Sequence, residues 1–138
     1  NQILGIIQFV LVGIAAISLI VGAVGITNSM YTTVLERTKD IGIMKSIGAR
    51  NADVLLIFLI ESGLMGLVGG FFGVLLGTGI SLAIGQYSTQ AGFKLIVSLN
   101  IPLMIFGLLF ASIIGMVSGI LPARSAAKLK PVEALRYE

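Results

Sequence analysis

The sequence predicts an all-α membrane protein with three transmembrane helices and a short amphipathic helix between the first two. Its mean hydropathy is +1.07, and only 11% of its 138 residues are charged, against about a quarter in soluble domains. Residues 1–35, 62–93 and 95–123 carry no charge, and each run exceeds the roughly 20 residues that cross a bilayer. We therefore expect spans at about 9–31, 54–84 and 102–121. A soluble bundle is excluded because these runs offer no polar face.

The composition also excludes several classes of function. Nine Lys and Arg against six Asp and Glu give a net charge of +3, which is too small and dispersed for nucleic-acid binding. The absence of His and Cys removes thiol chemistry and the usual zinc ligands. Few groups remain for acid–base or nucleophilic work. We expect no catalytic residue, no metal site and no directly bound cofactor.

The basic residues predict the orientation. Four Lys and Arg lie in residues 36–53, four in 124–138, and one, Lys94, in the loop 86–100. Since basic loops stay in the cytoplasm, the first loop and the tail 122–138 are expected inside and the N-terminus outside. A chain that starts outside without charge or signal is expected to be the C-terminal part of a longer, multi-pass membrane protein.

Small residues recur at four-residue spacing within the second and third spans. Such spacing lets helix backbones approach closely in lipid, although glycine is also simply common in membrane helices. The packing interpretation is preferred because several small residues share one helix face. The expected packing residues are Gly66, Gly69, Gly70, Gly73, Gly77, Gly115 and Gly119.

Polar residues within the spans are few, and Asn28 and Glu61 stand out among them. Asn28 is expected near the inner end of the first span, where it can bond across helices. Glu61 lies about 10 Å along the second helix from its start. An intramembrane carboxylate indicates a functional group by default. We favour a pairing with a loop base such as Arg50 or Lys45, because no span contains a second ionisable group for a proton relay.

The charged loop predicts an amphipathic helix over about 36–49. Ile41, Met44 and Ile47 recur at three-residue intervals, which indicates one apolar helix face. Gly48 suits the end of this helix, and Asn51 suits the N-cap of the next. The apolar stripe is compatible either with the lipid headgroup layer or with a groove on a cytoplasmic partner.

Four strings of this sequence resemble those of ABC-transporter permeases of the MacB/FtsX/LolCE type. Residues 36–49, ERTKDIGIMKSIGA, resemble the family's E-R-T-x-E-I-G-x-x-K-A-I-G-A, with Asp40 in place of Glu and Ser46 in place of Ala. Residues 21–28 resemble V-G-G-I-G-I-M-N, residues 58–62 resemble F-L-I-E-A, and residues 121–136 resemble L-P-A-R-x-A-A-x-x-x-P-x-E-A-L-R. The matching strings follow the family order over nearly the whole chain.

The resemblance implies four membrane helices, with a large extracytoplasmic domain between the first and second. The three spans here would be the second to fourth, in the cytoplasmic (inner) membrane. It also implies a permease homodimer, and a partner ABC ATPase that binds ATP-Mg. Residues 36–49 would be the coupling helix on that ATPase. The residues expected to couple are Glu36, Arg37, Asp40, Ile41, Gly42, Met44, Lys45, Ile47 and Gly48.

Three functions are compatible with this resemblance and these residues. The first is a permease subunit that exports or extracts a peptide, an antibiotic or a lipoprotein. The second is an FtsX-like signalling subunit that controls an extracytoplasmic partner without transport. The third, a channel or ion-coupled carrier, needs several polar groups along a path, and only Asn28 and Glu61 support it.

Overall fold

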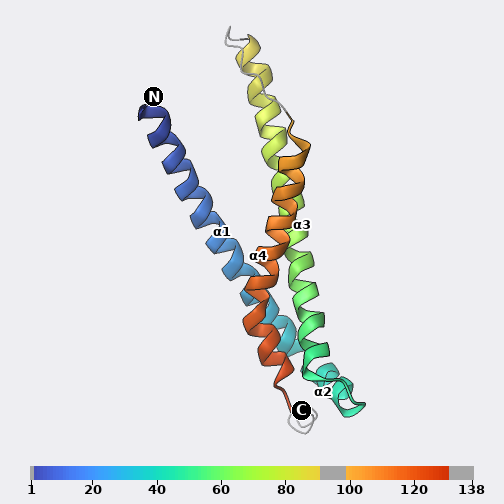
Figure 1. The fold of residues 1–138 in the computed structure, drawn as a ribbon. Coiled ribbons are helices and arrows are strands. Elements are labelled where there is room, and N and C mark those ends of the chain that lie inside the picture. The colour runs from blue at the N-terminus through green and yellow to red at the C-terminus, as the bar shows by residue number, and fades with distance from the viewer. Residues whose placement is uncertain (1, 91–98, 131–138) are drawn as a thin grey trace.

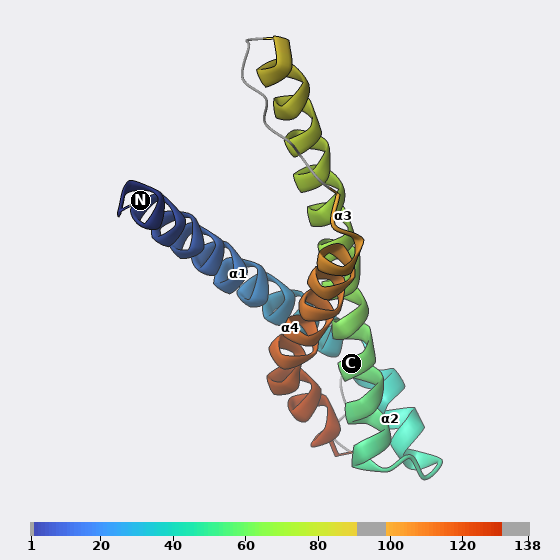
Figure 2. The same ribbon diagram turned by 45° about the horizontal axis from the view of Figure 1, so that its top comes forward.

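The computed structural model describes residues 2–90 and 99–130, and it is helical throughout most of them. The helices are α1 (Gln2–Glu36), α2 (Thr38–Ser46), α3 (Asn51–Gln90) and α4 (Ile101–Ala127). α3 and α4 run antiparallel and side by side, whereas α1 meets them near α2 and then diverges (Figures 1 and 2). Lys94 and the tail beyond residue 130 lie outside the described residues.

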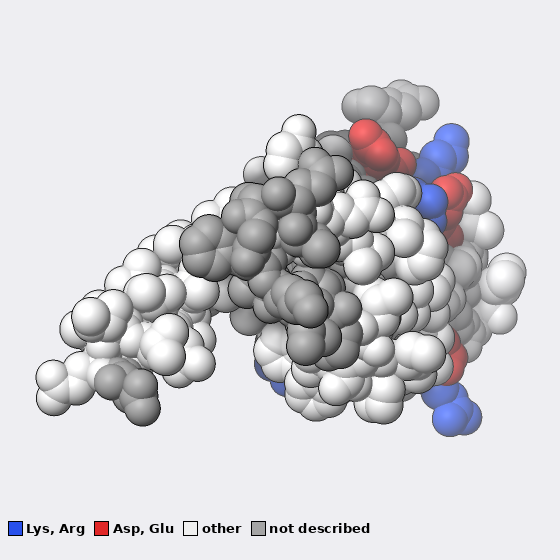
Figure 3. All heavy atoms as spheres, turned by 90° about the horizontal axis from the view of Figure 1, so that it is seen from above, with Lys and Arg blue, Asp and Glu red and all other residues white. Residues whose placement is uncertain are grey.

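The three predicted spans are confirmed as helices long and apolar enough to cross a membrane. The helices extend beyond the expected bounds because an uncharged run marks only the part suited to lipid. α3 has 40 residues, which is about 60 Å at 1.5 Å per residue and about twice the hydrocarbon thickness. In a view from the end opposite α2, acidic and basic side chains appear only at the rim of the molecule (Figure 3).

α3 and α4 pack through a ladder of small residues. Ser62 meets Gly119, Gly66 meets Gly115, and Gly70 meets Ala111. Each step moves four residues forward in α3 and four back in α4, as antiparallel helices require. A Cβ placed on Gly115 would lie 2.9 Å from the Cα of Gly66, so the backbones touch. The packing roles predicted for Gly66, Gly70, Gly115 and Gly119 match this contact, which Ser62, missed by the sequence argument, completes.

The other three predicted packing glycines lie outside this ladder. Among the described residues, nothing lies within 4 Å of the position that a Cβ would take on Gly69, Gly73 or Gly77. Toward the far end of α3, Gly77 lines a hollow together with Leu103 and Met104 of α4. These three glycines are exposed on α3, so a packing role for them stays a prediction.

α1 is joined to α4 through a carbonyl that a proline leaves free. Pro122 lies inside α4 and has no N–H to donate to the carbonyl of Ser118, four residues earlier. Thr27 Oγ1 of α1 lies 2.8 Å from this carbonyl and 3.0 Å from that of Ala23 in its own helix. Donation to Ser118 satisfies a backbone group that would otherwise have no helical partner, as a lipid environment demands.

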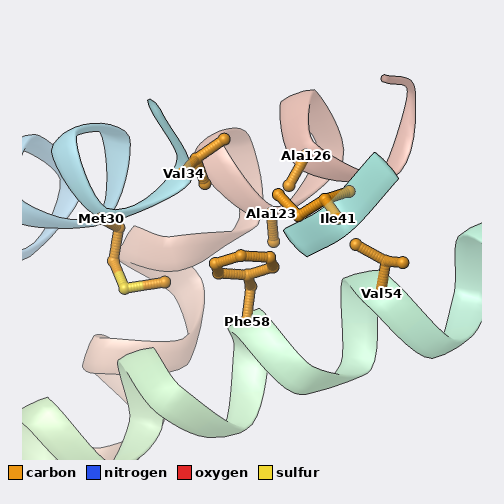
Figure 4. Close-up of a cluster of buried hydrophobic side chains, with 7 residues drawn as sticks. All are labelled: Met30, Val34, Ile41, Val54, Phe58, Ala123 and Ala126. Atoms are coloured by element: carbon orange, nitrogen blue, oxygen red, sulfur yellow. The ribbon is translucent and has the colours of Figure 1, made fainter. Parts of the chain in front are cut away.

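All four helices meet in one hydrophobic core at the α2 end. Figure 4 shows the side chains pointing toward one another from each helix. The core members are Met30, Val34, Ile41, Val54, Phe58, Ala123 and Ala126.

Helix α4 begins at the other end of the bundle. Asn100 is its N-cap, and the Asn100 side chain accepts from the N–H of Leu103 at 3.2 Å. Pro102 lies in the first turn, where its missing N–H costs nothing.

Replacing Gly115 by Leu is expected to destabilise the α3–α4 pair by about 1–3 kcal/mol, because overpacking a tight contact forces the backbones apart. The free energy of unfolding in an SDS titration measures this loss. Gly79→Leu is the matched control, since nothing lies within 4 Å of its Cβ position. Equal losses in both variants would contradict the close-contact interpretation.

Thr27→Val is expected to cost about 1 kcal/mol, because it removes an interhelical hydrogen bond within the spans. Thr27→Ser keeps the hydroxyl and should cost less. In a Pro122→Ala background, the new N–H can reach Ser118, so the cost of Thr27→Val should shrink toward zero. An unchanged cost in the double-mutant cycle would show that the freed carbonyl is not the important acceptor.

The α2 end as candidate functional site

The position of α2 follows from a turn at Arg37. The N–H of Arg37 donates to the carbonyl of Thr33 at 3.0 Å, and the carbonyl of Arg37 accepts from Ile41 at 3.0 Å. The backbone therefore stays hydrogen-bonded while the chain changes direction between α1 and α2. Helix α2 covers Thr38–Ser46, which is shorter than the expected 36–49, because Glu36 ends α1 and Gly48 terminates α2.

Gly48 ends α2 as predicted. Its φ is 107°, which is a left-handed conformation that suits glycine. The N–H of Gly48 donates to the carbonyl of Lys45 at 3.1 Å, and that of Ala49 to Met44 at 3.0 Å. These two bonds form a Schellman motif, so the helix ends abruptly and the chain can re-enter the bundle as α3.

The expected N-cap of α3 was wrong. Asn51 is the first helical residue, and Arg50 takes the cap position. The carbonyl of Arg50 accepts from the N–H of Asp53 at 3.0 Å, and the Asp53 carboxylate accepts from the N–H of Arg50 at 2.9 Å. The carboxylate thus supplies the return bond of a capping box, which leaves no N-cap role for Asn51.

The apolar stripe of α2 is divided between two surfaces. Ile41 is 0% exposed and belongs to the core, with the partly buried Met44 packed against it. Ile47 is 81% exposed and Ile43 is 45% exposed. The expected apolar stripe is therefore not one exposed face: Ile41 and the buried Gly42 face the protein's own core, since a helix this short needs an anchor. The exposed side of α2 presents Ile43 and Ile47.

Lys45 reaches the end of α4 rather than the surface. Its side chain is half-buried, and its Nζ donates to the backbone carbonyls of Ala127 and, at 2.7 Å, of Leu129. These carbonyls lie more than 80 residues farther along the chain. Lys45 is therefore an internal contact between α2 and α4, whereas Glu36, Arg37 and Asp40 lie exposed nearby.

Glu61 pairs with a base at the α2 end, but not with either base that we expected. Its Oε1 lies 3.5 Å from Nη1 of Arg37, and the two side chains are 25% and 55% exposed. Lys45 is directed to α4, and Arg37 stands at the turn that faces α3. Glu61 therefore pairs with a base, as we expected, but its partner is Arg37 and not Arg50 or Lys45.

The intramembrane amide of Asn28 makes no interhelical bond within the described residues. Asn28 is exposed on α1, and the neighbouring Thr27 makes the bond to α4 instead. Sequence reasoning missed Thr27, Pro122 and Ser62. Pro122 could have been found from the sequence, because a proline within a helix frees a carbonyl one turn earlier. Its donor Thr27 could not, because that bond depends on which helix lies beside the carbonyl.

Comparison with known proteins identifies the family. The profile described as "FtsX-like permease C-terminal" matches residues 12–131. An ABC transporter permease of Methanocaldococcus jannaschii is 45% identical over the whole chain, which spans 35% of that relative. The macrolide export ATP-binding/permease protein MacB of Bdellovibrio bacteriovorus is 48% identical over 96% of the chain, which spans 20% of it.

A third relative agrees. The ABC transporter permease YknZ of Bacillus subtilis is 42% identical over the whole chain, which spans 34% of its length. The chain thus spans between a fifth and about a third of these curated relatives. The profile match covers α2, α3 and α4 in full and α1 from residue 12 onward. The chain therefore belongs to the FtsX-like permeases and corresponds to their C-terminal domain.

Proposed function

We propose that this chain is part of the membrane permease of an ABC transporter and that α2 receives the ATP-driven motion of a partner ATPase. The observation that carries this proposal is the divided stripe of α2. Its inner side is fixed in a core shared by all the long helices, and its outer side exposes Ile43 and Ile47. A force applied to the outer side is transmitted to the long helices, because the core between them is closely packed.

The names of the relatives support an ATPase partner. The MacB relatives are called export ATP-binding/permease proteins, so an ATP-binding unit accompanies the permease in those proteins. In our proposal the partner binds ATP-Mg, and this chain contributes no catalytic residue. A second permease copy completes the assembly in the inner membrane, with the α2 end in the cytoplasm, as the excess of Lys and Arg predicts.

The proposed work is export or extraction of a substrate on the outer side. A peptide, an antibiotic or a lipoprotein is the substrate class, in keeping with the macrolide export named for the relatives. An FtsX-like signalling subunit uses the same α2 contact without transport, and the family match supports it as the second candidate. The ion pair of Glu61 with Arg37 argues against a carrier, since it engages the acidic group that such a path would need.

Ile47→Glu tests the docking surface. The expected result is loss of co-purification with the ATPase and a fall of ATPase activity to the permease-free level, because a carboxylate replaces an apolar contact. Thermal unfolding should stay unchanged, since Ile47 is 81% exposed. Ser46→Glu, also exposed on α2, is the control. Full binding and stimulation by Ile47→Glu would refute the docking role.

Single-cysteine labelling tests the orientation, because the sequence contains no Cys. A Cys at Lys39 on α2 should react with a membrane-impermeant maleimide only after the cells are permeabilised. A Cys at Tyr87, which is 79% exposed near the far end of α3, should react in intact cells. The reverse pattern would place α2 outside, where no ATPase operates.

A further inference from the structure

The C-terminal end of α4 receives a charged donor from α2. The last carbonyls of a helix have no partners within the helix. In α4, the carbonyls of Arg124 and Ser125 accept from the N–H of Lys128 at 3.2 and 3.3 Å, and that of Ala126 accepts from Leu129 at 3.2 Å. The carbonyls of Ala127 and Leu129 receive the Lys45 ammonium. Backbone and side chain together thus satisfy the end of α4.

We propose that Lys45 is a positioning residue that clamps α2 to the C-terminal end of α4, so that α4 moves with α2. The transmission part of this inference rests on the proposed function, whereas the clamp itself does not. A cation at the C-terminus of a helix is stabilised by the helix dipole. A hydrogen bond from a charged donor is also stronger than one between neutral groups.

The other contacts of α2 are less suited to fixing its direction. Ile41 packs in the core through apolar contacts, which are non-directional. The Arg37–Glu61 pair is partly exposed at 3.5 Å, and exposed pairs contribute little. No carboxylate among residues 2–90 and 99–130 lies within ion-pair distance of Lys45. Lys45 therefore supplies the directional link between α2 and a long helix far away in sequence.

The end of α4 is also well placed to pass motion onward. Helix α4 contacts α3 through the Gly66–Gly115 ladder and α1 through Thr27. Both contacts involve the backbone of α4 directly, so a displacement of α4 acts on each neighbour without a flexible side chain of α4 between them. The clamp would make α4 the first long helix to follow α2.

The first experiment measures the clamp without any ATPase. Spin labels replace the exposed Ser46 and Ser125 in the complete permease, free of other cysteines, in lipid nanodiscs. The unaltered clamp should give one narrow distance. Lys45→Met keeps the apolar stem and removes the charge, and it should broaden the distribution. The ratio of clamped to unclamped molecules should fall by about tenfold, as expected for loss of a hydrogen bond from a charged donor.

Two variants control this experiment. Lys45→Arg keeps a cationic donor and should restore the narrow distance, whereas Lys45→Met with an unchanged narrow distance would overturn the clamp. Lys39→Met removes an exposed charge from the same helix and should change nothing. Equal broadening by Lys39→Met would also overturn the proposal, because it would trace the effect to net charge on α2.

The second experiment adds the ATPase and ATP. The Lys45→Met permease should still bind and stimulate the ATPase, because Ile43 and Ile47 are intact. Its substrate or signalling output should fall by about tenfold, in proportion to the ratio of clamped to unclamped molecules. Full output with a broadened distance would show that α4 does not carry the motion. Failure of the unaltered permease to bind the ATPase would refute the proposed function and leave the clamp result standing.

Discussion

The fold depends on backbone-to-backbone contact between α3 and α4. Apolar side chains gain nothing by leaving lipid for each other, so helices in a bilayer associate through close packing and a few hydrogen bonds. The Gly66–Gly115 crossing meets that requirement because neither residue has a side chain to hold the helices apart. The ladder fixes the register of α4, and the positions of Ser118 against α1 and of Ala127 against α2 follow from it.

The sequence predicted what depends on composition and local chemistry. Uncharged length identified the three spans, four-residue spacing identified Gly66 and Gly115, and the need for a left-handed residue identified Gly48. These features follow from the solvent of the helices or from the backbone of a single residue. They are therefore visible without knowledge of which helices are neighbours.

The remaining details of the site depend on tertiary neighbours. The sequence shows that Ile41 and Ile47 are both apolar. Only the position of the core decides that Ile41 is buried and Ile47 exposed. Arg37, Arg50 and Lys45 are equivalent partners for Glu61 in sequence terms. The direction of the turn at Arg37 and the carbonyls at the end of α4 select among them.

The length of α3 has a mechanical consequence. From its tight crossing at Gly66 to its last helical residue, Gln90, the helix runs 24 residues, or about 36 Å. If that crossing serves as a fulcrum, a tilt of about 10° swings the far tip by about 6 Å for a helix of this rise per residue. The shorter arm toward Asn51 moves less. α3 would therefore act as a lever whose displacement is larger at the end remote from α2.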